Sequence, residues 1–407
     1  MNSWDQALEA GRLYRSTGNL AANLLRPHVF RAWERAHVEG ANPRRPHADS
    51  LSPLDTERLC TRESKLIEAA RPYMSALSGA SGGERHAAML SDARAIVLDV
   101  LGDERSVHGP ERVPGPGTLL DEPACGANGL GTPLAEGGYV EIVGPEHFVE
   151  AFGLLTCQGI PLRHADGSVA GVLGIAVWRQ ETGQRLREIL LCAAHGIEAE
   201  LLQGRLKEDV RRVLAAHEPA GSALARLWRD LLETQATTRV GLGAAARELA
   251  GSRMIYARDL LELVSVSLQR FRRHAALWRE LASEGAEAPR PVALHAAVHD
   301  IAELLEVEAA VHHVELVLHA IEPTVVVADP RALSRALFRC FLGAIEGARG
   351  GAVHVDVVRV PAGGELVLTQ TPGLGAARAV PAPLRRAFSS RASAPDDVIV
   401  SSSTAQG

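Results

Sequence analysis

Hydrophobic positions in the second half of this 407-residue sequence repeat at alternating spacings of three and four residues. The repeat consists of Met254, Ala257, Leu261, Val264, Leu268, Phe271, Ala275 and Trp278. Such a stripe predicts a helix whose narrow apolar face packs on another helix, as in a coiled coil or an antiparallel bundle. We predict that the stripe joins two copies of the chain, and packing inside one chain is the alternative. The predicted dimer contacts are Leu261, Val264, Leu268 and Phe271.

Helical and strand-like patterns alternate in the chain before this stripe. Apolar spacing predicts helices over residues 1–40, 55–77, 182–217 and 223–249, and a turn at 250–252. A hairpin is predicted over 88–101, with its turn near Asp92, and further strands over 139–143 and 169–177. Asp166 and Gly167 supply a tight turn before the last strand. Antiparallel strands with flanking helices predict an α+β fold.

The C-terminal part alternates again after a Pro- and Glu-containing linker at 284–291. We predict helices over 292–310 and 330–348, and strands over 313–319, 324–327, 352–360 and 365–368. The Ser-rich stretch 389–407 is predicted to be disordered. The resulting domains are an N-terminal helical segment with a loop (1–54), a sensor-like domain (55–203), and a helical linker with a dimerisation hairpin of two helices (204–284). They are followed by an α/β domain (290–388) and the tail (389–407).

Composition narrows the function classes. The only lysines, Lys65 and Lys207, lie outside any Walker A sequence, so no phosphate-binding loop of that type is present. The five cysteines are dispersed, which is typical of reduced thiols. A net charge of −6 gives no general attraction to nucleic acid, and no apolar run approaches a membrane span. We therefore expect a cytoplasmic protein without direct nucleic-acid or membrane binding.

Several strings in the first half carry a family resemblance. They are RAWERAHVEGANP (31–43), ESKLIEAARPYM (63–74), GANGLGTPLAEG (126–137), PEHF (145–148) and CQGIPLRHADGSVAGVLGI (157–175). Together they resemble the ligand-sensing GAF domain that opens sigma-54-dependent activators of the acetoin-regulator type. The chain departs from that pattern at Leu120, where the family usually has Trp, and at Ala127, where it usually has Thr. The resemblance therefore implies a sensor and leaves its ligand unnamed.

A small-molecule cavity is expected between the sheet of this domain and the loop 119–131. Glycines at 126, 129 and 131 allow that loop to approach a ligand closely. The polar groups expected near it are Glu122, Asn128, His147 and Cys157. The alternative is that these residues only stabilise the turns of the loop. The spacing of His147 and Cys157 matches no compact metal motif, so no metal is expected.

The segment 292–358 resembles the start of a histidine-kinase ATPase domain of the GHKL type, an α/β sandwich. Active members of that family hold magnesium and phosphate with two asparagines, and the matching positions here are Arg339 and Gly343. Neither residue can ligate a cation. Thr369 stands where the family has an adenine-reading aspartate, and no histidine lies between His217 and His274 to accept phosphate. The resemblance therefore implies a degenerate nucleotide site.

These features predict a non-catalytic regulatory protein, in which a GAF-like sensor is coupled through a dimeric helical bundle to a pseudokinase domain. We expect the chain to bind a small-molecule ligand, a second copy of itself and a protein partner in a regulatory pathway. We expect no cofactor. An assembly protein without a ligand and an atypical active sensor kinase are the alternatives. An open, polar sensor cavity would favour the sensor, and a cavity filled by side chains would favour assembly.

Overall fold

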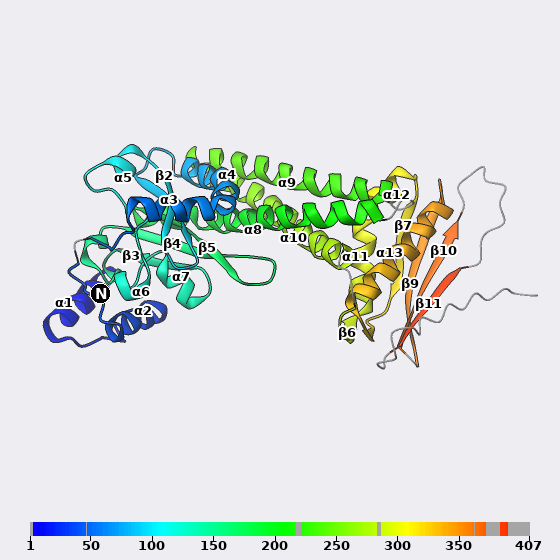
Figure 1. Cartoon of the computed structure of the whole chain (residues 1–407), viewed down its shortest axis with the longest axis horizontal. Coiled ribbons are helices and arrows are strands. Elements are labelled where there is room, and N and C mark those ends of the chain that lie inside the picture. The colour runs from blue at the N-terminus through cyan, green and yellow to red at the C-terminus, as the bar shows by residue number, and fades with distance from the viewer. Residues whose placement is uncertain are drawn as a thin grey trace, which may run out of the picture. The chain divides into compact units, whose positions relative to one another are not determined.

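The computed structural model describes residues 3–45, 47–216, 221–282, 286–361, 363–371 and 383–389 (Figure 1). Except for Ser389, the tail predicted for 389–407 lies outside these residues. Contacts divide the chain into two compact units. The first contains Met1–Leu202 with Gln235–Gln269, and the second contains Gln203–Thr234 with Arg270–Gly407. Each unit is described by itself.

The first unit is built on a five-stranded antiparallel sheet. Its strands are β1 (His86–Asp92), β2 (Val97–Gly102), β3 (Val140–Val143), β4 (Thr156–Arg163) and β5 (Val169–Val177), in the order β2-β1-β5-β4-β3. The predicted hairpin at 88–101 and the predicted strands at 139–143 and 169–177 are confirmed. Gly167, at φ +84°, occupies the predicted turn between β4 and β5, because that backbone angle favours glycine.

Strand β5 lies at the centre of this sheet and is covered on both faces. A Cβ added at Gly171 would lie 3.1 Å from Leu66, on the helix that covers one face. A Cβ added at Gly174 would lie 2.9 Å from Leu130, in the loop that covers the other face. Successive side chains of a strand alternate between faces, so both faces of β5 require small or apolar residues. The apolar run that predicted this strand follows from its burial on both sides.

Short helices surround the sheet. They are α3 (Pro53–Arg62), α4 (Ser64–Ala80), α5 (Glu104–His108), α6 (Glu122–Cys125), α7 (Gly131–Glu136), and the 3₁₀ turns η1 (Gly144–Glu146) and η2 (Glu150–Phe152). The helix predicted over 55–77 is two helices, because Glu63 leaves the helical range at φ −92° and ψ 14°. Helix α4 packs on β1 and β2.

The N-terminal helices α1 (Ser3–Thr17) and α2 (Pro27–Val38) belong to the same unit as the sheet. Trp33 of α2 forms a core cluster with Ile142 of β3 and Phe148, and the Trp33 and Phe148 rings meet edge to face at 5.4 Å. Helix α2, which the sequence pattern assigned to a segment separate from the sensor-like domain, therefore contributes to the core of that domain. The aromatic contact joins segments more than a hundred residues apart, which is why local patterns do not reveal it.

Three long helices follow the sheet: α8 (Gln180–Ala216), α9 (Gly221–Ala250) and α10 (Met254–Ala282). The predicted turn between α9 and α10 is confirmed, and its Ser252 has φ +58°. In the described part of the chain, none of the helices is long and apolar enough to cross a membrane.

The predicted dimer stripe of α10 is already covered inside one chain. The exposed fractions of Leu261, Val264, Leu268 and Phe271 are 4%, 3%, 2% and 0%. The Cys192 thiol of α8 donates to the Leu261 carbonyl at 3.8 Å, and a Cβ added at Gly241 of α9 would lie 2.9 Å from Val264. A contact between two chains through this stripe would have to displace α8 and α9. The apolar spacing is explained by packing within the chain, the alternative noted from the sequence.

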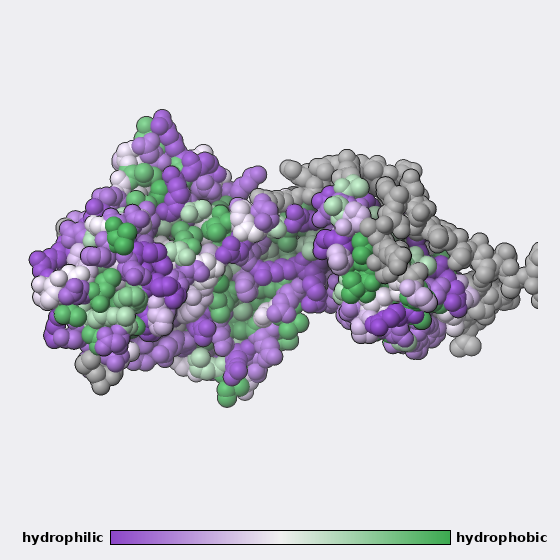
Figure 2. Space-filling view, turned by 90° about the horizontal axis from the view of Figure 1, so that it is seen from below, coloured by the Kyte–Doolittle hydropathy of each residue, from purple (hydrophilic) through white to green (hydrophobic). Residues whose placement is uncertain are grey.

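A second, exposed apolar stripe runs along α10. Figure 2 shows a largely hydrophilic face of the molecule that apolar residues interrupt in separate clusters. Ile255, Tyr256, Leu263 and Val266 are 77%, 65%, 65% and 59% exposed. Tyr256 directly follows Ile255, Leu263 lies seven residues after Tyr256, and Val266 lies three residues after Leu263. These spacings place all four on one side of the helix. This stripe leaves apolar side chains of α10 exposed within a single chain.

The second unit contains a four-stranded mixed sheet and a two-stranded one, with orders β11-β10-β9-β7 and β6-β8. Its elements are β6 (Arg290–Ala293), α11 (Leu294–Leu304), α12 (Glu306–Val311), β7 (Glu315–Ile321), β8 (Val325–Ala328), α13 (Pro330–Gly347), β9 (Ala352–Val360), β10 (Gly363–Thr371) and β11 (Leu384–Ser389). Helix α13 packs on β9 and β10, and α11 packs on α13. Both units therefore combine helices with mainly antiparallel strands, in agreement with the predicted α+β class.

Two strands of this unit differ from the sequence prediction. Strand β6 includes residues predicted to be linker, and it pairs with β8 from Arg290–Ala328 to Ala293–Val325. Strand β11, for which no strand was predicted, pairs with β10. Both strands are short, and both form through pairing with a distant segment, so the local hydrophobic pattern carries little of the signal.

Candidate functional site

A small cavity lies in the first unit, where the sequence predicted one. Asn128 and Leu130 of the loop, His147, and Cys157 of β4 are among the residues that line it. Its volume is about 30 Å³. That is about the share of one water molecule in the liquid. The cavity is therefore mostly filled by side chains, and in this conformation it is too small for a metabolite.

Glycines bring the loop close to the sheet beside the cavity. A Cβ added at Gly159 of β4 would lie 1.9 Å from the carbonyl oxygen of Gly129. A Cβ added at Gly129 would lie 2.7 Å from the Cβ of Cys157. Gly126 adopts φ +59°, which favours glycine. These glycines allow the close approach of the loop that the sequence predicted, and the loop packs against β4.

Asn128 is fully engaged in holding the loop. Its amide nitrogen donates to the carbonyl groups of Leu120 at 2.9 Å and Gly126 at 2.7 Å. Its Oδ1 accepts from the backbone N–H groups of Leu130 and Gly131, both at 2.9 Å. The side chain is 4% exposed. Asn128 thus lines the cavity, and its hydrogen bonds serve the turn, as the alternative interpretation expected.

Glu122 lies outside the cavity. Its carboxylate accepts hydrogen bonds from Arg35 of α2, at 2.5 Å from Nε and 3.0 Å from Nη2. Its side chain is 5% exposed, so the arginine supplies the charge that a buried carboxylate requires. Glu122 therefore joins the N-terminal helix to the loop, and of the four predicted residues only Asn128, His147 and Cys157 meet at the cavity.

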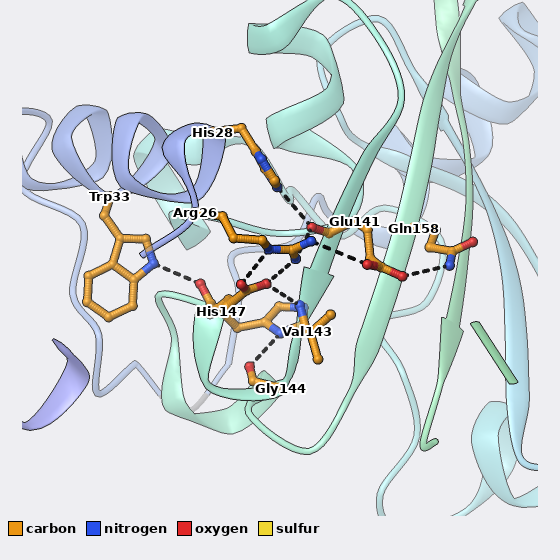
Figure 3. Close-up of polar contacts among 9 residues, drawn as sticks. Arg26, His28, Trp33, Glu141, Val143, Gly144, His147 and Gln158 are labelled. Carbon is orange, nitrogen blue, oxygen red and sulfur yellow. Dashed lines mark hydrogen bonds and ion pairs between the residues drawn. The ribbon is translucent and has the colours of Figure 1, made fainter. Parts of the chain in front are cut away.

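His147 presents a ring nitrogen that has no protein partner. Its Nδ1 is 2.9 Å from the Gly144 carbonyl oxygen (Figure 3). Because a carbonyl only accepts, Nδ1 carries the proton in the neutral ring. Burial lowers the pKa of His147 to about 4, against a smaller opposing effect of the Gly144 hydrogen bond, so the ring is neutral at pH 7. The buried Nε2 has no hydrogen-bond partner within the described ranges and is a free acceptor.

A buried ion pair supports the backbone on which His147 sits. Arg26 donates from Nε to Glu146 Oε1 at 2.6 Å, and its Nη2 contacts Oε2 of the same carboxylate (Figure 3). Glu146 also accepts from the Val143 N–H at 2.8 Å, and its carbonyl accepts from Trp33 Nε1 at 2.7 Å. Sequence reasoning missed Arg26, which lies 120 residues from Glu146. The PEHF string was the available signal, since its glutamate directly precedes the histidine.

Cys157 contributes a thiol to the cavity wall. Burial raises the pKa of this thiol to about 12, so it stays protonated at pH 7. A metal ion requires the thiolate, and a protonated thiol in an apolar surrounding is a weak hydrogen-bond donor. The arrangement at Cys157 therefore suits a neutral occupant.

An open cleft of about 770 Å³ lies next to the cavity in the same unit. Four residues line both spaces: Val113, Pro114, Phe152 and Leu155. The cleft and the cavity therefore adjoin at these residues. The Phe152 ring meets the His147 ring edge to face at 6.1 Å, so this shared lining contacts the residue with the free acceptor.

The predicted degenerate nucleotide positions lie in the second unit. Arg339 and Gly343 are exposed on α13, and their spacing of four residues places them on one face of the helix. A Cβ at Gly343 would meet open space. Thr369 is half-buried on β10, paired with His354 of β9. Residues 372–382, which follow this strand, lie outside the described residues.

Part of the chain resembles known proteins. The family described as MimR, N-terminal domain, matches residues 4–196. The acetoin dehydrogenase operon transcriptional activator AcoR of Bacillus subtilis is 26% identical over 226 residues, which are 55% of this chain and 37% of that protein. The propane 2-monooxygenase operon transcriptional activator MimR of Mycolicibacterium goodii is 26% identical over 232 residues, which are 51% of this chain and 37% of that protein.

The match to these curated relatives therefore spans little more than a third of their length. Among solved structures, the Escherichia coli DhaR(N)–DhaL complex covers 48% of this chain and 67% of the matched chain, at 17% identity and a TM-score of 0.44. The range that the family model matches contains the residues that line the cavity. Residues 4–196 match a MimR N-terminal domain and are homologous to transcriptional activators of acetoin and propane operons.

Proposed function

We propose that this chain is a regulatory protein whose first unit is a GAF-like sensor and whose second unit is a non-catalytic, pseudokinase-like output domain. The observation that carries the sensor is the buried Nε2 of His147, which has no hydrogen-bond partner among the described residues. It lies at a cavity in the part of the chain that the MimR N-terminal domain model matches. An unsatisfied buried acceptor costs about 1–3 kcal/mol. The filled cavity taken alone favours assembly. The unpartnered acceptor weighs against it, because a fold that served assembly alone would gain stability by replacing this acceptor with an apolar side chain.

The proposed output is a change in how the chain meets a protein partner. The relatives regulate operons, and we carry regulation of transcription to this chain as part of the proposal. A net charge of −6 offers no general attraction to DNA, so the effect would pass through a partner that binds DNA. A ligand that prefers one conformation of the sensor shifts the equilibrium by its differential affinity for the two states.

The sensor proposal predicts that a small metabolite stabilises the full chain. A ligand at a hundred times its Kd should add about 2.7 kcal/mol to the free energy of unfolding of the unit that binds it. Thermal-shift screening of neutral metabolites of up to six carbons measures this as a rise in Tm. Cys157→Met adds two carbons to the cavity wall and should abolish the rise. Cys60→Met is the matched control, because Cys60 lies outside the cavity and should leave the rise intact.

If no compound raises the Tm of the wild-type chain, the sensor proposal is wrong and the assembly function takes its place. If Cys157→Met keeps the response, the responding site lies elsewhere in the protein.

The pseudokinase proposal predicts no autophosphorylation. Arg339 and Gly343 offer no magnesium ligand, and no histidine lies between 217 and 274 to accept the phosphate. Incubation with radiolabelled ATP and magnesium should leave the chain unlabelled, next to an active histidine kinase as positive control. Label that survives purification and is abolished by replacing one residue of helix α9 or α10 would instead establish an atypical kinase.

A further inference from the structure

A group of metal-ligating side chains lies on helix α11 of the second unit. His299, Asp300 and Glu303 each place a ring nitrogen or a carboxylate oxygen within 4.8 Å of the other two, and we call them the α11 triad. Glu303 lies one helical turn after the other two residues, so the three side chains are neighbours on the helix surface. His299 is exposed, and the two carboxylates are half-buried. His299 and Glu303 also line an open cleft of about 530 Å³, which connects the triad with solvent.

A buried histidine from another helix points into the α11 triad. His274 of α10 is 4% exposed, and its Nε2 lies 3.9 Å from Glu303 Oε1. Among the described residues, this nitrogen has no hydrogen-bond partner. Burial lowers the pKa of His274 to about 4, against the opposing effect of the Glu303 charge. Arg270 and Arg273 lower this pKa further, so the ring is neutral at pH 7. A neutral imidazole is the form of histidine that binds a metal ion.

Two arginines now balance the charge of Glu303. Arg273 donates from Nη2 to both carboxylate oxygens, at 3.0 and 3.1 Å, and Arg270 Nε lies 3.7 Å from Oε1. The Arg273 side chain is 48% exposed, so its guanidinium can turn into solvent when another cation takes its place. An ion pair with an exposed partner contributes little to stability, and its loss is a small obstacle to metal binding. Asp300 and Glu303 together match the charge of a divalent ion.

We propose that the α11 triad and His274 together bind one Zn²⁺ ion. Imidazole nitrogens and carboxylate oxygens are ligands that zinc accepts in four-coordinate sites. Ligand atoms around tetrahedral zinc lie about 3.3 Å apart, as follows from metal–ligand distances of about 2.0–2.1 Å. The triad atoms, now up to 4.8 Å apart, therefore have to approach each other by up to about 1.5 Å. Rotation of the solvent-accessible side chains of α11 supplies this movement.

The ion would tie together two helices of the second unit. His274 comes from α10 and the triad comes from α11, so a shared metal restrains both. Because the unfolded chain does not hold the four ligands together, binding stabilises the folded state. The site lies outside the unit that contains the sensor cavity. The zinc proposal therefore goes beyond the proposed function and does not rest on it.

The test is calorimetric titration of ZnCl₂ into the full chain after treatment with a chelator, under conditions that keep the cysteines reduced. We expect one ion to bind per chain, with a Kd in the micromolar range or below, and to raise Tm. Co²⁺ in place of Zn²⁺ should give the intense visible absorption of a tetrahedral ion. The absorption reports on the ligands directly, so it separates a metal site from a general effect of zinc on stability.

Variants of single ligands locate the site. Asp300→Asn and Glu303→Gln keep the size of each side chain and should raise Kd at least about tenfold, the loss that even a supporting residue of a metal site produces. His274→Phe keeps a buried ring, removes the nitrogen and should have the same effect. Glu306→Gln is the matched control, because Glu306 lines the same cleft beside Arg270 but lies outside the triad. This variant should leave Kd unchanged.

A wild-type chain that binds no zinc would overturn the proposal. Wild-type affinity in both Asp300→Asn and Glu303→Gln would overturn it too, because the ion would then be held elsewhere, for example by cysteines. These two positions are only half-buried, so the test does not depend on whether His274→Phe folds. If His274→Phe does fold and keeps both the affinity and the Co²⁺ absorption, α10 supplies no ligand and the four-residue site is wrong.

Discussion

Leu268→Glu is expected to lower the free energy of unfolding by about 4 kcal/mol or more, because it places a charge at a position that is 2% exposed. Truncating a buried leucine alone costs about 2–5 kcal/mol, and an unpaired carboxylate adds its loss of hydration. Urea unfolding followed by circular dichroism measures the difference from the wild type. On the original interpretation of the stripe as a dimer contact, the same change would yield a stable monomer.

Leu263→Glu is the matched control on the same helix. Leu263 is 65% exposed, so its replacement should change stability by less than about 0.5 kcal/mol. If the chain forms a homodimer through the exposed stripe of α10, this variant should run as a monomer in light scattering. A Leu268→Glu chain that keeps wild-type stability and only loses its partner would instead show that the buried stripe joins two chains.

Arg26→Ala is expected to lower the free energy of unfolding by about 3 kcal/mol. Its partner Glu146 is 5% exposed at the side chain, so removal of the guanidinium leaves a buried carboxylate without its counter-charge. Removing one partner of a buried ion pair typically lowers the free energy of unfolding by about 3–5 kcal/mol. The partial exposure of Arg26 favours the lower end of this range. Urea unfolding measures the loss, and the response to ligands should weaken as well, because Glu146 precedes His147.

Arg31→Ala gives the matched control for this ion pair. Arg31 also pairs with a glutamate of the same unit, Glu136, but its side chain is 51% exposed. Surface pairs contribute at most about 1 kcal/mol. Combining Arg26→Met with Glu146→Gln should recover part of the stability lost in Arg26→Ala, since the double variant leaves no buried charge. Equal losses for Arg26→Ala and Arg31→Ala would contradict the role of burial.

The sequence predicted most elements of the fold from local pattern. The repeat from Met254 to Trp278 indicated a helix with one buried stripe, and the structure has that helix as α10. The apolar run from Val169 to Val177, after an Asp-Gly turn, indicated a buried strand, and it is the central strand of the sheet. These predictions succeed because a helix or a strand imposes its own period on the side chains it buries.

The candidate site was predicted in part. The motif strings placed Asn128, His147 and Cys157 at one cavity, where the structure has them. They also placed Glu122 near the ligand, whereas its carboxylate is held by Arg35. Glutamate in a loop has the same local signature whether it faces a ligand or an arginine from another helix. Its role depends on which helix packs nearby.

By itself, the sequence determined the periodic elements, the glycine positions of the loop and the residue types at the cavity. Tertiary structure alone decided that the α10 stripe is covered by α8 and α9 and that Arg26 pairs with Glu146. It also decided that the cavity has a volume of about 30 Å³. The physical reason is the range of each interaction. Periodicity reports which side of an element avoids water, but the partner that covers that side, and the space left between them, follow from packing among segments far apart in the chain.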